Sequence, residues 1–164
     1  MKNTKVTSRT NSPAEVVITV TEFRPVLSPE LRGARDTGYT MKLKRPHPRV
    51  SLKDDTLVVK APGAVISLTI AAKDKIKYYP AGITFVREDS EKLSEALRLG
   101  RPDLLQRKIV IDGQTLTFTD RFKKGTENVL YKFSVILQRG SDGAIGIIDP
   151  GLENDNRPRV QAKA

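Results

Sequence analysis

The chain contains no cysteine and no tryptophan, and only one of its 164 residues is histidine. The absence of cysteine excludes a disulfide framework, a thiolate metal site and a thiol nucleophile. The single histidine, His47, stands between two prolines, so a Ser-His-Asp triad would have one available base, in a loop. Structural zinc and copper sites lack their usual ligands for the same reason. No glycine-rich phosphate loop is present, and we expect no metal and no cofactor.

Long apolar runs are also missing. No stretch approaches the length of a membrane span, and residues 1–14 carry lysines without the apolar core of a signal peptide. We expect residues 1–14 to be a disordered basic leader and the protein to be cytoplasmic, without membrane contact.

Positive charge is in excess, at a formal net +10. Between Arg32 and Lys53 the chain carries a single acid, Asp36, among arginines and lysines. Four tyrosines and five phenylalanines in the whole chain do not indicate a stacking platform for bases. Nucleic acid is therefore expected to bind this basic stretch only non-specifically, through charge.

Apolar and polar residues alternate with a period of two along most of the chain, which predicts strands. Clear runs are residues 15–23 and 129–139, and the clearest local signal is residues 108–118, two alternating runs around Asp112-Gly113. Pro62-Gly63 predicts a turn with a positive φ at its second residue, and Asp112-Gly113 predicts a type I′ hairpin. Many short strands at regular spacing predict an all-β fold, an antiparallel β-sandwich that is immunoglobulin-like in outline.

One segment has the spacing of a helix, because Leu93, Ala96 and Leu97 share a face and Gly100 can end it. We expect one short helix near residues 90–99. A chain of this length is expected to form one domain. The expected organisation is a leader of residues 1–14, a β-sandwich domain of residues 15–149 and a C-terminal tail of residues 150–164.

The last predicted strand ends in an Asp-Pro bond, between Asp149 and Pro150. An aspartate can open a turn, and a proline ends a strand because it lacks an amide hydrogen. The same pair also allows chemistry. The carboxylate of Asp149 can attack its own carbonyl carbon through a five-membered ring, expel the proline nitrogen and leave a cyclic anhydride that water opens. Such a reaction would cut the chain at this bond.

The reaction needs two carboxyl groups, one ionised to attack and one protonated to donate to the leaving nitrogen. Glu153 and Asp155 follow closely in the sequence and are candidates for the second group. Asp120, at the end of another predicted strand, is a third candidate that can arrive across the fold. The sequence does not choose among these three acids.

The segment "VLYKFSVILQRGSDGAIGIIDPGLENDNRP", residues 129–158, resembles the C-terminal signature of the DP-EP family of small bacterial β-sandwich proteins. The likeness continues more loosely upstream to about residue 15. It implies a self-processing, aspartic-peptidase-like activity within a homo-oligomer, with Asp149 as attacking group, Pro150 as leaving nitrogen and Glu153 at the following acidic position. The chain departs from the family in having Arg157-Pro158 where the family has Glu-Pro.

Two other functions remain open. The first is a non-enzymatic oligomeric assembly module in which the tail after Asp149 docks on a neighbouring subunit. The second is an anion or nucleic-acid binder that uses the basic stretch, in which Arg45 and Arg49 would contribute.

Overall fold

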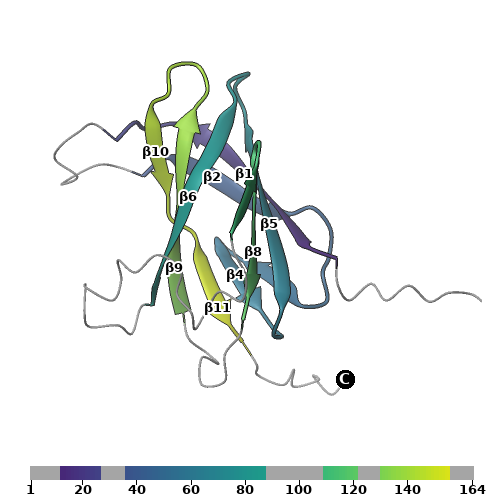
Figure 1. Ribbon diagram of the computed structural model, residues 1–164. Coiled ribbons are helices and arrows are strands. Elements are labelled where there is room, and N and C mark those ends of the chain that lie inside the picture. The colour runs from purple at the N-terminus through teal and green to yellow at the C-terminus, as the bar shows by residue number, and fades with distance from the viewer. Residues whose placement is uncertain (1–11, 27–35, 88–108, 122–129, 156–164) are drawn as a thin grey trace, which may run out of the picture.

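The fold is described from a computed structural model that defines residues 12–26, 36–87, 109–121 and 130–155. In these ranges the chain forms strands and no helix, and the strands make two sheets (Figure 1). The expected all-β class is confirmed for these residues. The short helix expected near residues 90–99 lies outside the described ranges, as do most of the leader and the end of the chain.

The first sheet has five strands. Their spatial order is β2 (Gly38–Leu43), β1 (Ala14–Glu22), β5 (Ala64–Ala72), β8 (Thr115–Asp120) and β7 (Val110–Asp112).

The second sheet has six strands and is built around the long strand β9 (Leu130–Arg139). One edge of β9 pairs with β6 (Tyr78–Arg87). The other edge pairs with β11 near the start of β9 and with β10 farther along it. Beyond β11 lie β4 and β3. The bounds are β10 (Ile145–Ile148), β11 (Gly151–Asn154), β4 (Thr56–Val59) and β3 (Val50–Lys53).

Both sheets are mixed, so the expectation of purely antiparallel sheets is wrong for two strand pairs. β1 runs parallel to β5, and β11 runs parallel to β4. Parallel neighbours need a long crossover connection. The chain supplies one in each case, because β2, β3 and β4 come between β1 and β5, and β5 to β10 come between β4 and β11.

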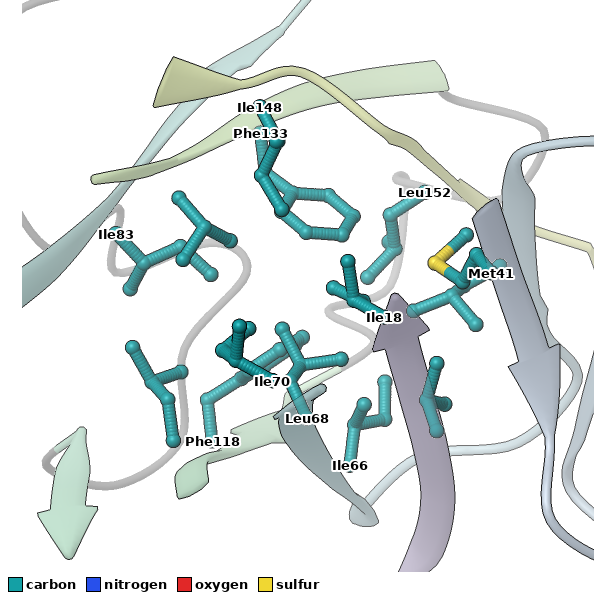
Figure 2. Packing of buried hydrophobic residues seen from close by; sticks show 14 of the residues in the cluster. Ile18, Met41, Ile66, Leu68, Ile70, Ile83, Phe118, Phe133, Ile148 and Leu152 are labelled. Atoms are coloured by element: carbon teal, nitrogen blue, oxygen red, sulfur yellow. The ribbon is translucent and has the colours of Figure 1, made fainter. Parts of the chain in front are cut away.

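The two sheets enclose one hydrophobic core (Figure 2). Every second residue of the alternating runs points into it, as predicted. Phe85, Phe118 and Phe133 join the sheets, with ring centroids 5.3 to 6.3 Å apart. In residues 15–23 and 129–139, the fully buried side chains are those of Val16, Ile18, Tyr131, Phe133, Val135 and Leu137.

The predicted turns are confirmed at one position and shifted at another. Gly63 has a φ of 73°, as the Pro62-Gly63 turn requires. The β7–β8 hairpin is centred one residue later than expected, because Asp112 pairs with Thr115. Gly113, with a φ of 55°, is therefore the first central residue, the position at which a type II′ turn requires glycine. The expected type I′ turn is wrong.

The chain does not leave the sheet after Asp149. Gly151–Asn154 forms β11, which pairs with β9 on one edge and with β4 on the other. The side chains of Leu152 and Asn154 are fully buried. The segment expected to be a tail from residue 150 thus contributes a central strand to the second sheet. The sequence did not indicate this strand, because "GLEN" contains none of the β-branched or aromatic residues that are enriched in strands.

Candidate functional site

Asp149 and Pro150 connect β10 to β11 along the same edge of β9. Both strands pair with β9 in one register, so no residue is looped out. Asp149 consequently lies opposite Ser134, and Pro150 lies opposite Phe133. The side chain of Asp149 is exposed on the outer face of the sheet, whereas the proline ring is buried.

The backbone after the Asp-Pro bond is held by hydrogen bonds on both sides. The amide of Phe133 donates to the carbonyl oxygen of Pro150 at 3.0 Å, and proline has no amide hydrogen to return the bond. The amide of Gly151 turns to the other side and donates to the carbonyl oxygen of Asp55 at 3.0 Å. The leaving nitrogen of a cleavage reaction would therefore sit in a fixed piece of sheet.

The sheet divides at this point, because β10 and β11 have different outer neighbours. β11 pairs with β4, whereas β10 is bordered by the residues just before and just after residues 27–35. In the later of these two segments, the amide of Thr37 donates to the carbonyl of Ile147 at 2.9 Å. This close packing needs Gly146. A Cβ there would lie 2.6 Å from the ring of Phe23 and 2.7 Å from Oγ1 of Thr37. The segment that contains Asp36 and Thr37 therefore lies close against β10, and this position places Asp36 next to Asp149.

Asp36 and Asp149 form a carboxyl pair. The pKa of Asp36 is raised above its usual value by desolvation, by the charge of Asp149 and by a hydrogen-bonding contact between the two carboxyl groups, while the charge of Arg24 acts in the opposite direction. On the other side of Asp149, the hydroxyl of Ser134 donates to its Oδ1. Asp149 thus has an acid on one side and a hydroxyl donor on the other.

Tyr39 lies half-buried beside this pair, at the start of β2. Burial, followed by the negative charges of Asp55, Asp149 and Asp36, raises the pKa of its phenol to about 12. Three carboxylates therefore converge on one tyrosine in a protein with a large positive net charge. Such a concentration of negative charge favours the protonated form of Asp36.

The three acids proposed from the sequence lie elsewhere. Glu153 and Asp155 follow Asp149 by four and six residues, which along an extended strand places their Cα atoms roughly 13 and 20 Å away. Asp120 lies at the end of β8 in the first sheet, where it pairs with Ala64 and is fully buried. Its side chain is on the inner face, and the second sheet separates it from Asp149. The structure brings none of the three to Asp149.

Sequence reasoning missed Asp36, although it noted this residue as the lone acid of the basic stretch. No local pattern connects Asp36 with Asp149, and only the course of the chain along β10 does so. Arg157-Pro158, which stands where the DP-EP family has Glu-Pro, lies outside the described residues.

The basic stretch is partly neutralised in the structure. The carboxylate of Glu15 forms ion pairs with Arg45 at 3.1 Å and with Lys44 at 3.8 Å, and both cations are largely solvent-exposed. Nη1 of Arg49 donates to the carbonyl of Pro62 at 3.3 Å. Lys44, Arg45 and Arg49 are thus engaged within the fold. Arg32 and Arg35 belong to the undescribed part of the stretch.

His47 makes two hydrogen bonds with the backbone. Its Nδ1 accepts the amide of Arg49 at 3.2 Å, so its Nε2 carries the hydrogen and donates to the carbonyl of Ser12 at 2.9 Å. An open cleft of about 590 Å³ adjoins it. The cleft is lined by Ser12, Pro13, Glu15, Arg45, Pro46, His47 and Pro48.

No protein-family model matches the chain, and no curated protein matches it. Over the described ranges, no helix is long and apolar enough to cross a membrane. Nor do those ranges contain a group of three or more histidine, aspartate or glutamate side chains placed to hold a metal ion.

Proposed function

We propose that the protein is a β-sandwich, immunoglobulin-like in outline, that cleaves its own peptide bond between Asp149 and Pro150. The observation that carries the proposal is the pairing of Asp36 with Asp149. An aspartate that attacks its own carbonyl needs a second, protonated carboxyl group nearby, and Asp36 has a raised pKa for a reason that the geometry explains. The C-terminal resemblance to the DP-EP family points to the same bond.

In the proposed reaction the ionised carboxylate of Asp149 attacks the carbonyl carbon of its own residue. The bond to the nitrogen of Pro150 breaks as Asp36 donates its proton to that nitrogen. The products are a cyclic anhydride at Asp149 and a free amine at Pro150. Water then opens the anhydride, with the Asp36 carboxylate accepting a proton, so that Asp36 ends as it began.

Cleavage does not by itself free the C-terminal fragment. β11 is paired on both edges and buries Leu152 and Asn154, so the fragment that begins at Pro150 stays bound to the folded protein. The nicked protein would retain its fold, and gel filtration would not separate the two fragments.

The test is the intact mass under denaturing conditions after incubation at near-neutral pH, with brief handling in acid because acid alone breaks Asp-Pro bonds. We expect a fragment of residues 1–149 from the wild-type protein and none from Asp149→Asn. Asp36→Asn should slow cleavage, and most strongly at mildly acidic pH, where Asp36 is more often protonated. Asp54→Asn, which removes an exposed negative charge from the nearby β3–β4 turn, is the matched control and should cleave normally.

Two results would overturn the proposal. One is a wild-type protein that stays at full length for days under these conditions. The other is equal cleavage of the wild-type protein and Asp36→Asn at every pH, which would leave only the intrinsic lability of the bond. Asp36 must be protonated to donate. The ratio of the wild-type cleavage rate to the Asp36→Asn rate should therefore fall as the pH rises through the raised pKa of Asp36.

The two alternatives are weaker on the present geometry. Docking of the tail on a neighbouring subunit would have to use residues beyond β11, since Gly151–Asn154 pairs within its own chain. Anion binding through Arg45 would have to compete with Glu15.

A further inference from the structure

The site contains a second nucleophile for the anhydride, besides water. Ser134 stands directly opposite Asp149 in the β9–β10 register, and its hydroxyl donates to Oδ1 of Asp149. An oxygen in hydrogen-bonding contact with a carboxylate oxygen is already near the separation of about 3–3.5 Å from which it can attack the adjoining carbon. Oγ of Ser134 therefore lies close to Cγ of Asp149 without any rearrangement of the backbone.

A base for this serine is also present. Once Asp36 has given its proton to the nitrogen of Pro150, it is a carboxylate in contact with the Asp149 side chain. It can then accept the hydroxyl proton of Ser134, directly or through one water molecule. The seryl oxygen and this base lie on the two sides of the same carboxyl group.

Resting on the proposed cleavage, we infer that Ser134 captures the anhydride and forms an ester with the side chain of Asp149. The Oγ–Cγ bond of the ester forms, the anhydride C–O bond at Cγ breaks, and the main-chain carboxylate of Asp149 is released. The hydroxyl proton passes to Asp36. The amide bond between Asp149 and Pro150 is thus exchanged for an ester between β9 and the end of β10, and no water is consumed.

The modification would change what the cut does to the fold. Hydrolysis leaves Asp149 as a free chain end on the edge of β9. The ester instead ties that end to β9 covalently at the point where the sheet divides, while the fragment that begins with Pro150 stays in place through the β11 ladders. The outcome is a nicked protein that is cross-linked next to the nick.

The experiment measures the mass of the fragment 1–149 over time in the full-length protein, after denaturation. The ester predicts a fragment lighter by one water than the hydrolysed fragment, and its conversion to the hydrolysed mass in mild base. Tandem mass spectrometry must show a covalent link between Ser134 and Asp149. This assignment separates the ester from loss of water at Asp112-Gly113 or Asp142-Gly143, two other sites prone to cyclisation.

Two variants complete the test. Ser134→Ala should cleave and give only the hydrolysed fragment, whereas Ser134→Thr, which keeps a hydroxyl, should restore the lighter one. A wild-type protein that yields the hydrolysed mass at all times would overturn the ester and leave the proposed cleavage intact. An absence of any cleavage in the wild-type protein would overturn both.

Discussion

Replacing Gly146 by alanine should destabilise the protein by filling space that the fold does not have. A Cβ at this position would meet the ring of Phe23 at 2.6 Å and Oγ1 of Thr37 at 2.7 Å, both closer than real Cβ contacts. Overpacking of this kind costs about 1–3 kcal/mol. For a chain of this size, that cost lowers the melting temperature by roughly 2–12 °C.

Gly82→Ala is the matched control. Gly82 also lies in a strand of the second sheet, and the nearest atom to a Cβ there is Cδ1 of Ile136 at 3.7 Å, an ordinary contact. Neither glycine has a positive φ, so backbone strain does not enter the comparison. Gly82→Ala should be neutral or stabilise by up to about 1 kcal/mol, because alanine restricts the unfolded chain.

Urea denaturation of the two variants measures the difference. We expect a lower midpoint for Gly146→Ala at an unchanged slope, which indicates lost stability and not a changed unfolded state. Because the same contact holds the Asp36 segment against β10, this variant should also cleave more slowly than Gly82→Ala. Equal midpoints for the two variants would refute the reasoning about the packing at Gly146.

Three further predictions concern the rest of the fold. Leu152→Ala should lower the free energy of unfolding in urea by about 2–5 kcal/mol, and Val110→Ala on an exposed edge by less than about 0.5 kcal/mol; equal effects would contradict the placement of β11. A titration followed by phenolate absorbance should show a step near pH 12 that Tyr39→Phe removes. Because the folded protein favours the neutral phenol of Tyr39, the resulting stability is present below pH 10 and is lost as the pH rises toward 12. The Arg139 guanidinium lowers the pKa of Asp142 to about 2, so its stabilisation is present above the ordinary value of 3.8 and lost as the pH falls toward 2; the urea midpoints of the wild type and Asp142→Asn should converge there.

The strands were predictable where a single local rule governs them. Val16, Ile18 and Val20 occupy every second position of the strand and are buried as expected, since a strand has a period of two and one face meets the core. The short strand β11 was not predictable in the same way. Its backbone is extended because β9 and β4 offer hydrogen bonds on both edges, and those partners are far away in the sequence.

The candidate site divides in the same way. The bond that we propose to react can be identified from the sequence, because the five-membered ring and the leaving nitrogen belong to adjacent residues, Asp149 and Pro150. The second carboxyl was sought among acids nearby in sequence or at the end of another strand, and the structure provides Asp36 instead. Ser134 also escaped notice, since its relevance depends on the register between β9 and β10.

The sequence by itself determined the all-β class of the described residues, with strands in most of the right places. It also determined the absence of thiol chemistry and the position of the bond that we propose to react. These properties depend on residue type and on neighbours along the chain. Only the tertiary structure decided the mixed sheets, the inclusion of β11 and the pairing of Asp36 with Asp149. The physical reason is that backbone pairing and side-chain pKa values respond to groups that are close in space, and folding alone determines which groups those are.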